Sequence, residues 1–446
     1  MGDTLHAWLD GAHVGVFHRT GSGRITFRYD SPDGAPVSLS LPRTDGIRAS
    51  APEAFLENLL PEDGAARARM ALRLHVDSTD PFALLREADT VGGLTFTAEA
   101  EPRGRTVVAS PVDDEEIARQ VGYAARNGHH WFARDPDDEF SERPLPRCRF
   151  SIAGGQPKIT LARRAGVWLW PNIAIPSTHI LKAEVRGCAG SDRVEDATMT
   201  LGGLCGLPVA EHGVWEAEGA HAFIVRRFDR IIRDGTVHRL HCEDLAQAMG
   251  LRPDMKYAIT AADCVRFLRR HDPTDGMAYE WIRRLAFNVS SADCDSHGRN
   301  YSIIPGADGF RFAPMYDMAA TRTWPHLDQE MAMPVNGVQY AELLTPHDWE
   351  AFAVSVGLDG ERVVHTARTM AYHVLERREE ATKGVPGAVR DAMLNAIGRA
   401  NEAICPLDGL IPAGGEPKGG YATGGLVWVG PHTRSGHAVS GYWRSR

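Results

Sequence analysis

Residues 293–317 carry the pattern that decides the fold. They read Asp-Cys-Asp-Ser-His-Gly-Arg-Asn-Tyr-Ser-Ile-Ile-Pro-Gly-Ala-Asp-Gly-Phe-Arg-Phe-Ala-Pro-Met-Tyr-Asp. Asp295 precedes Asn300 by five positions, and Asp317 closes the stretch after a short β-hairpin with a Gly-rich turn. An apolar helix over 281–289 is expected to deliver the chain to this loop.

The spacing of Asp295 and Asn300 predicts phosphoryl transfer. In protein-kinase catalytic loops, an Asp accepts the proton of the substrate hydroxyl and an Asn five positions later holds magnesium. A later Asp supplies the other metal ligand, and Asp317 falls where that ligand is needed. The sequence therefore predicts ATP and Mg²⁺ as cofactors.

Other interpretations of this loop compete with phosphoryl transfer. Asp, Asn, Ser and Gly gather in ordinary surface turns. An EF-hand would begin at Asp293, but Ile304 stands where calcium binding requires a glutamate. Zinc could bind Cys294 and His297, yet two further ligands are missing at a recognisable spacing. A metal-dependent hydrolase built on the acidic residues is the least favoured alternative.

Composition and charge exclude several classes of protein. The 446 residues are 43% hydrophobic and 24% charged, which allows two or three domains with buried cores. A net charge of −9 disfavours direct binding of nucleic acid by this chain alone and is compatible with binding of a basic protein partner. The seven scattered cysteines indicate reduced thiols. Without a membrane-length apolar run or a signal-type N-terminus, we expect a cytoplasmic protein with no membrane contact.

The two ends of the chain differ in composition from its middle. Residues 1–105 alternate as short strands and continue into an amphipathic helix that begins at Pro52. Residues 106–149 are acidic and rich in Pro, and we interpret them as a linker region, although 115–121 could form a helix. Residues 406–446 are rich in Gly and aromatics. They predict a small hairpin or a disordered tail, with a basic–aromatic arm for a polyanion as the alternative.

The middle of the chain predicts two lobes. Strand signals dominate residues 150–240, whereas helical periodicity dominates 241–405 apart from the hairpin. A β-rich segment followed by a helical one is the order of a bilobal, kinase-like α+β fold, in which ATP lies between the lobes.

A cradle for phosphate groups is expected over residues 151–158. No Walker-type loop occurs, but this segment reads Ser-Ile-Ala-Gly-Gly-Gln-Pro-Lys and leads into a strand. Small residues at Ala153, Gly154 and Gly155 let backbone N–H groups approach phosphate oxygens, and Lys158 adds positive charge. A Gly-Gly pair is also common in ordinary turns.

Lys182 is the candidate ATP lysine. It lies in the alternating segment 179–185, where a kinase places the lysine that bridges the phosphates and pairs with a helix carboxylate. Glu195, on a helix expected over 193–204, is the candidate partner. A lysine in this position is otherwise more often a solvated surface charge.

Several ordered segments together resemble one family. The chain resembles the HipA-type serine/threonine kinases, the toxins of type II toxin–antitoxin modules, over roughly residues 5 to 405. The matching segments are Trp-Leu-Asp-Gly (8–11), Phe-Leu-Glu-Asn-Leu-Leu-Pro (55–61), the 151–158 loop, Ser-Thr-His-Ile-Leu-Lys (177–182), Arg-Phe-Asp-Arg (227–230), His-Cys-Glu-Asp (241–244), Asp-Ser-His-Gly-Arg-Asn (295–300) and Pro-Met-Tyr-Asp (314–317).

The resemblance implies a role for each matched residue. Asp295 would be the catalytic base, with Asn300 and Asp317 as magnesium ligands, and Lys182 would contact the ATP phosphates. Ser151 matches the family's autophosphorylation position, where a phosphate of about −1.5 to −2 charge would repel ATP. The other implied nucleotide contacts are Ala153, Gly154, Gly155, Gln156, Pro157 and Lys158 in the loop, Arg226, Arg227 and Phe228 in the hinge beside the adenine, and His297, Gly298 and Arg299 with Asn300.

The resemblance also implies partners and a target class. A small helix-turn-helix antitoxin would bind the protein, DNA would be reached only through that complex, and the substrate would be a translation component such as an aminoacyl-tRNA synthetase. The chain departs from the family at Asp293 and Cys294, at Arg226 and at Cys242. A carboxylate at 293 could raise the proton affinity of Asp295 and slow it. A pseudokinase that binds nucleotide and antitoxin as a co-repressor is therefore the alternative.

Overall fold

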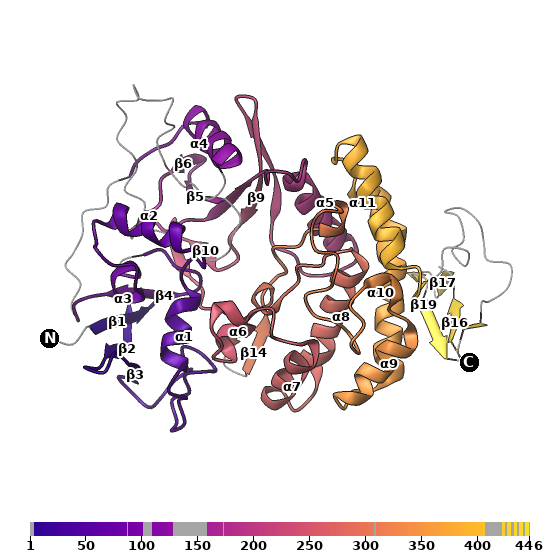
Figure 1. Cartoon of the computed structure of the whole chain (residues 1–446), viewed down its shortest axis with the longest axis horizontal. Coiled ribbons are helices and arrows are strands. Elements are labelled where there is room, and N and C mark those ends of the chain that lie inside the picture. Colours follow the sequence, from indigo (N-terminus) through magenta and orange to yellow (C-terminus); the bar gives the residue numbers. More distant parts are fainter. Residues whose placement is uncertain are drawn as a thin grey trace. The chain divides into compact units, whose positions relative to one another are not determined.

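Two compact units make up the computed structural model in Figure 1. The structure describes residues 4–86, 88–100, 109–127, 158–172, 174–306 and 309–405, and short strands between 422 and 445. The first unit comprises residues 1–196, 208–259 and 297–317, and the second comprises 197–207, 260–296 and 318–446. Antiparallel sheets together with helices confirm the predicted α+β class.

The N-terminal part of the first unit is a four-stranded sheet with short helices. Successive side chains of a strand point to opposite faces, so Leu5, Phe17 and Phe27 gather in one core with Phe55 and Phe96. The predicted strands and the helix that begins near Pro are confirmed. The elements are β1 (Thr4–Leu9), β2 (Ala12–Arg19), β3 (Ile25–Tyr29), β4 (Leu94–Thr97), α1 (Ala51–Asn58), α2 (Gly64–Leu74) and α3 (Pro81–Leu84), with strand order β3-β2-β1-β4.

A second antiparallel sheet of five strands follows in the first unit (Figure 1). One of its faces is apolar, and Ile159, Leu161 and Leu181 pack there against the helix α4 (Asp114–Asn127). The strands are β5 (Lys158–Arg164), β6 (Val167–Leu169), β7 (His179–Ala183), β8 (His212–Ala217) and β9 (Ala220–Arg226), in the order β6-β5-β7-β9-β8.

Helix α4 corrects the interpretation of residues 106–149 as a linker for the part from 114 to 127, whereas residues 106–108 and 128–149 lie outside the described residues. Ile117, Val121 and Ala124 are buried in one core with the five-stranded sheet. Their spacing of four and three residues places them on one face of a helix. Asp114, Glu115 and Glu116 lie in the first turn of this helix, where negative charge favours the helix start, so acidic composition here did not indicate a linker.

The remaining elements of the first unit bring the chain to the predicted catalytic loop. The helix α5 (Ser191–Leu204) confirms the predicted helix and begins in this unit. The hairpin β13 (Ser302–Gly306) with β14 (Gly309–Phe312) is present as predicted, and β12 (Glu243–Asp244) pairs with β13. The others are β10 (Arg230–Arg233), β11 (Thr236–Arg239), α6 (Leu245–Ala248) and the short 3-10 helices η1 (Pro253–Met255) and η2 (Gly298–Asn300).

The second unit is helical, as the sequence predicted. Trp281 and Phe287 of α8 and Trp349 of α9 are among its fully buried side chains, and α10 packs against both helices. The apolar helix that precedes the catalytic loop is α8. The elements are α7 (Ala261–His271), α8 (Gly276–Ser290), η3 (Thr321–Thr323), η4 (Ala341–Leu343), α9 (Pro346–Ser355), α10 (Gly360–Ala381) and α11 (Gly387–Ala400).

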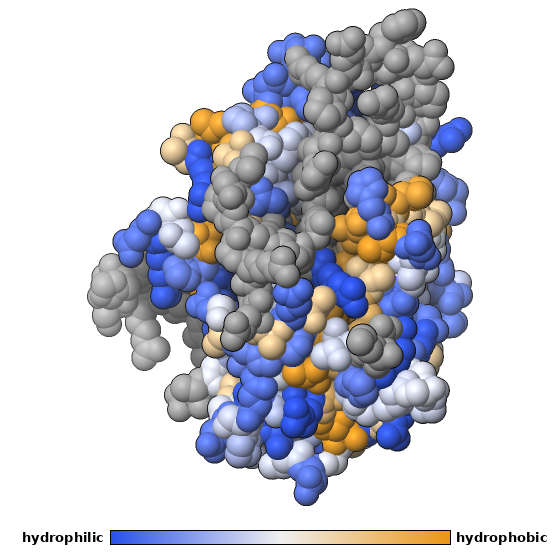
Figure 2. Space-filling view, turned by 90° about the vertical axis from the view of Figure 1, so that its left-hand side faces the viewer, coloured by the Kyte–Doolittle hydropathy of each residue, from blue (hydrophilic) through white to orange (hydrophobic). Residues whose placement is uncertain are grey.

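The C-terminal tail contains short antiparallel strands. They are β15 (Ala422–Thr423), β16 (Leu426–Val429), β17 (His432–Arg434), β18 (His437–Val439) and β19 (Tyr442–Ser445), paired as β15-β16-β19 and β17-β18. On a different face of the molecule, shown in Figure 2, hydrophilic residues alternate with smaller groups of apolar residues over the described part of the surface. Among the described helices, none has both the length and the apolar character needed to cross a bilayer.

Candidate active site

Two lysines lie side by side on the polar face of the five-stranded sheet. Lys158 of β5 and Lys182 of β7 are direct cross-strand partners, so their side chains share one face. Leu181 and Ala183, on either side of Lys182, belong to the opposite face, which packs against α4. Lys158 is 7% exposed and Lys182 is 5% exposed. Burying two positive charges so close together requires nearby carboxylates.

Glu195 and Asp317 supply those carboxylates. Lys182 Nζ donates to Glu195 Oε1 at 2.5 Å and also forms an ion pair with Asp317 Oδ1. The predicted pairing of Lys182 with Glu195 is therefore present. The amide of Asn300 donates to the carbonyl oxygen and to Oδ2 of Asp317, both at 3.2 Å. We call Lys158, Lys182, Glu195 and Asp317 the lysine cluster.

Electrostatics in the lysine cluster favour the charged form of Asp317. Desolvation opposes ionisation, but the charges of Lys182 and Lys158 outweigh it and hold the pKa of Asp317 well below its ordinary value. Burial lowers the pKa of Lys158 to about 8, with the charge of Lys182 acting in the same direction and Asp317 opposing both. The pKa of Lys182 is raised, because Asp317 and Glu195 outweigh its burial.

Asp317 keeps an opening to solvent. Its side chain is 48% exposed, although the lysine beside it is buried. Its backbone has a φ of 56°, in the left-handed region that Asp tolerates better than most residues and that is enriched at functional sites. This carboxylate is thus presented to a ligand while Lys182 and Asn300 fix its direction.

The donor atoms around Asp317 fit a magnesium ion. Asn300 Oδ1 is buried and accepts no hydrogen bond within the described residues, so this orphaned amide oxygen suits a hard cation. Within those residues, His, Cys, Asp and Glu form no group of three or more that could hold a metal by themselves. Magnesium is commonly bound by one or two protein oxygens together with substrate phosphates, and Asn300 with Asp317 matches that pattern.

The turn of η2 is fixed by contacts of its neighbours. A Cβ on Gly298 would lie 2.5 Å from Ile259 Cδ1, so this site of close approach favours glycine. The ring of His297 meets that of Tyr257 edge-on at 5.1 Å. The buried guanidinium of Arg299 forms ion pairs with Glu62 and Asp244, and sequence reasoning did not foresee these partners.

Asp295 lies in the second unit, in the loop that joins α8 to His297. Its side chain is exposed, and its backbone N–H donates to Oδ1 of Asp293 at 3.0 Å. The unexpected carboxylate at Asp293 is thus a buried hydrogen-bond acceptor that shapes this loop, a role that Asn could also fill. Cys294 is buried, and its Sγ donates to the carbonyl oxygen of Gln329 at 3.3 Å.

Arg226 and Phe228, two of the three predicted hinge residues, lie in different environments. Arg226 ends β9 with a partly exposed side chain that pairs with Glu211 at 2.9 Å. The ring of Phe228 lies 5.5 Å from that of Tyr316. Cys242, the other departure from the family in this region, is a buried core residue.

Arg227 belongs to a fully buried ionic network that sequence reasoning missed. Asp89 is 0% exposed and accepts hydrogen bonds from Ser177, Arg230 and Arg239 at 2.6 to 2.9 Å. Arg227 pairs with Asp229 at 2.7 Å and donates to the carbonyl oxygen of Thr90. The network joins the N-terminal sheet region to the five-stranded sheet. We call Asp89, Ser177, Arg227, Asp229, Arg230 and Arg239 the Asp89 cluster.

Most of the predicted phosphate cradle falls on residues that the structure does not describe. Ser151, Ala153, Gly154, Gly155, Gln156 and Pro157 lie outside the described residues. Lys158, the last residue of that segment, is described and belongs to the lysine cluster.

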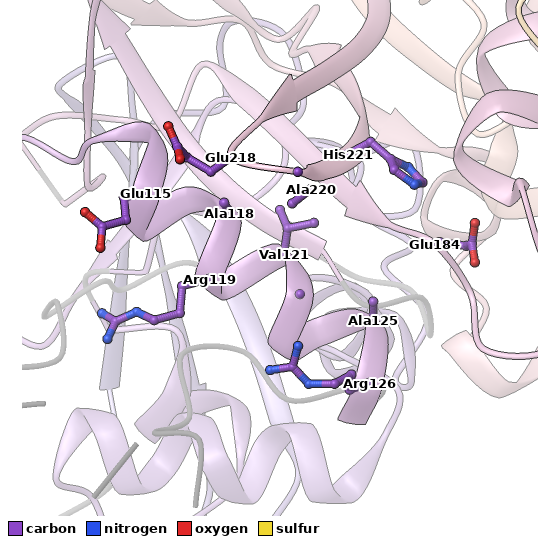
Figure 3. Close-up of a pocket in the computed structure, with 12 residues that line it drawn as sticks. Glu115, Ala118, Arg119, Val121, Ala125, Arg126, Glu184, Glu218, Ala220 and His221 are labelled. Atoms are coloured by element: carbon purple, nitrogen blue, oxygen red, sulfur yellow. The ribbon is translucent and has the colours of Figure 1, made fainter. Parts of the chain in front are cut away.

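A groove of about 490 Å³ lies elsewhere in the first unit (Figure 3). Its walls include Glu115 and Arg126 from α4, and Glu218 and His221 from the β8–β9 hairpin. Because α4 covers the apolar face of the sheet, this groove is on the opposite face from Lys182. It is therefore separate from the predicted nucleotide site.

Comparisons with known proteins place this α+β protein, with its Lys–Glu pair and its Asp–Asn pair, in a family. Residues 5–97 match the HipA N-terminal domain, and residues 150–378 match the HipA-like C-terminal domain. The candidate kinase Y4mE of Sinorhizobium fredii is 31% identical over 376 residues, which cover 79% of this chain and 86% of that protein. The chain belongs to the HipA-type kinase family.

Two further comparisons involve Shewanella oneidensis. Its serine/threonine-protein kinase toxin HipA is 25% identical over 378 residues, covering 79% of this chain and 82% of that protein. The solved structure of HipA with HipB and operator DNA from this organism matches with a TM-score of 0.76 and 22% identity. It covers 91% of this chain and 98% of that chain, so the two proteins share a fold.

Proposed function

We propose that this protein is an ATP- and magnesium-dependent serine/threonine protein kinase that acts as the toxin of a toxin–antitoxin module. The contact chain from Lys182 through Asp317 to Asn300 carries the proposal. It brings a buried cation, a half-exposed carboxylate and a side-chain amide together from distant parts of the sequence. Phosphoryl transfer depends mainly on such positioning and on neutralisation of charge.

Each residue of the site has a defined task in this proposal. Lys182 neutralises phosphate charge, and Glu195 holds its ammonium group in place. Asn300 and Asp317 would hold magnesium, which neutralises charge that develops on the phosphates. Asp295 orients the substrate hydroxyl and accepts its proton.

Ser151 is the proposed site of autophosphorylation. A phosphate placed in the Gly-rich segment would repel the phosphates of ATP and oppose the charge that Lys158 provides. Transfer of one phosphoryl group to Ser151 would therefore inactivate the kinase.

The family suggests how the activity is used. The Shewanella oneidensis structure contains HipA, HipB and operator DNA. We propose a small helix-turn-helix antitoxin as the partner of this chain in the cytoplasm, with DNA contacted through that complex. The net charge of −9 agrees with an indirect route to DNA. A translation component, such as an aminoacyl-tRNA synthetase, is the proposed substrate class.

Incubation with labelled ATP and magnesium tests the kinase directly. The wild type should label itself or a lysate protein, Asp295→Ala should label neither, and both should bind ATP. Phosphosite mapping of the expressed protein should find phosphate on Ser151 in the wild type alone. ATP binding without any transfer by the wild type would contradict the kinase and favour a pseudokinase. Release of inorganic phosphate without phosphoprotein would favour a hydrolase.

A further inference from the structure

The N-terminal domain reaches the catalytic loop through Arg299. The side chain of this residue is 6% exposed, and its guanidinium contacts Asn58, the last residue of α1, and Glu62, which follows that helix. Nη1 donates to Glu62 Oε1 at 2.5 Å, and Nη2 donates to the carbonyl oxygen of Asn58 at 2.9 Å. Nε donates to Asp244 Oδ2 at 3.3 Å. All three nitrogens of the fork are thus engaged by protein acceptors.

The backbone of Arg299 is held from the other side. Tyr316 Oη donates to the Arg299 carbonyl oxygen at 2.9 Å, and Tyr316 immediately precedes Asp317. The next residue, Asn300, donates its backbone N–H to the His297 carbonyl oxygen at 3.0 Å, which closes the turn of η2. Arg299 therefore contacts Glu62 through its side chain, and its backbone adjoins Asn300 and accepts from the residue that precedes Asp317.

Glu62 is central to this arrangement. Its Oε1 accepts from Arg299, while its Oε2 pairs with Lys256 Nζ at 3.0 Å. The charge of a buried arginine must be compensated, and acceptors at all three guanidinium nitrogens fix its orientation better than a single contact would. Without Glu62, the guanidinium would keep only Asp244 as a charged partner, and within the described residues the carbonyl oxygen of Asn58 would be its one remaining acceptor in the N-terminal domain.

We propose that Glu62 is a positioning residue for the kinase reaction: through Arg299 it sets the orientation of Asn300, so the N-terminal domain is part of the catalytic apparatus. This inference rests on the proposed function, because it assigns Asn300 to magnesium. Residues that orient metal ligands commonly change metal affinity or activity by about 10- to 100-fold when they are removed.

Glu62→Ala tests the proposal against a matched control, Glu57→Ala. Glu57 lies five positions earlier in the same domain, and its carboxylate pairs with Arg67 at 2.6 Å rather than with Arg299. Glu62→Ala should raise the magnesium concentration for half-maximal activity, or lower kcat, by about tenfold or more. Glu57→Ala should stay within about twofold of wild type. Glu62→Gln keeps an acceptor oxygen and should be intermediate.

Hydrogen exchange at the Asn300 amide provides a second measurement that needs no activity. Glu62→Ala should speed exchange at this amide by about tenfold, whereas Glu57→Ala should leave it unchanged. Equal behaviour of the two variants in both assays would overturn the positioning role. A wild type without kinase activity would refute the proposed function instead, and the exchange result would still decide whether Glu62 holds the turn.

Discussion

The first unit contains two buried charge clusters that differ in how completely they are closed. In the Asp89 cluster, the central carboxylate is 0% exposed, and Ser177 and two arginines donate to it. In the lysine cluster, Lys182 is buried but Asp317 is 48% exposed. Opposite charges hold the pKa of Asp89 and of Asp317 below their ordinary values, in both cases against desolvation.

This difference separates a closed charge cluster from one that can take up a ligand. A lowered pKa marks both carboxylates and therefore does not identify the active site. The exposure of Asp317 and the orphaned Oδ1 of Asn300 distinguish the lysine cluster as the candidate site, because they leave coordination positions that a ligand can fill. The predictions below test this contrast.

Removing Asp317 should have the largest effect on activity. Asp317→Asn loses a proposed metal ligand, and phosphoryl transfer should fall by about a thousandfold or more, because metal stabilisation of the transition state is worth several kcal/mol. The free energy of unfolding should fall by less than in Asp89→Asn, because Lys182 keeps its ion pair with Glu195 and the Asp317 side chain is half exposed. Kinetics and urea unfolding of the same preparation measure both. Full activity in this variant would place the metal elsewhere.

Asp89→Asn should show the reverse pattern. Removing one partner of a buried network leaves arginine charge uncompensated and typically costs about 3–5 kcal/mol of stability. Urea unfolding should reveal this loss, with exposed Asp33→Asn as a control that should stay within about 0.5 kcal/mol. Stability like that of the control would show that the Asp89 cluster is not structural.

The affinity for ATP should fall at alkaline pH. Lys158 has a pKa lowered to about 8 by burial, so it is charged below pH 8 and progressively neutral above it. If its charge contacts phosphate, the dissociation constant of ATP should rise above pH 8 by up to about tenfold per pH unit. Lys158→Arg, which stays charged, should abolish this trend. If the dissociation constant of ATP rose with pH in the Lys158→Arg variant as it does in the wild type, a group other than Lys158 would be responsible.

Two buried acids should give stability profiles of opposite sign. The pKa of Asp89 is lowered, so its stabilisation is complete above the ordinary value of 3.8 and is lost as the pH falls below it. Glu243 is buried with a backbone N–H as one partner, and desolvation raises its pKa from 4.5 to about 8. Its contribution is fully present below pH 4.5 and is lost as the pH rises toward 8.

Urea unfolding of the wild type and of Glu243→Gln at several pH values measures the contribution of Glu243 to the free energy of unfolding. The variant should flatten the profile between pH 4.5 and 8 and leave the acid limb unchanged. An unchanged slope in that interval would show that Glu243 is not titrating there.

The sequence predicted those parts of the site whose signals are local. Alternation along 179–185 and helical periodicity over 193–204 led to the Lys182–Glu195 pair, whose partners are 13 residues apart. The Asp–Asn spacing and the following hairpin led to Asn300 and Asp317. Each of these patterns is readable within a short window.

Contacts between distant segments could not be read in the same way. Asp89 and Arg230 are 141 residues apart, and Glu62 and Arg299 are 237 apart. A single charged residue in a sequence looks solvated until its buried partner is known. The core position of α4 was recoverable from its apolar spacing, but its acidic composition outweighed that signal.

Calorimetric titration of ATP, with and without magnesium, tests the central claim most directly. Magnesium should tighten ATP binding by about tenfold or more in the wild type and in Asp33→Asn, but not in Asp317→Asn. That result would establish the half-exposed carboxylate of the lysine cluster as the metal-nucleotide site. The same magnesium dependence in all three proteins, or no binding of ATP by the wild type, would contradict it.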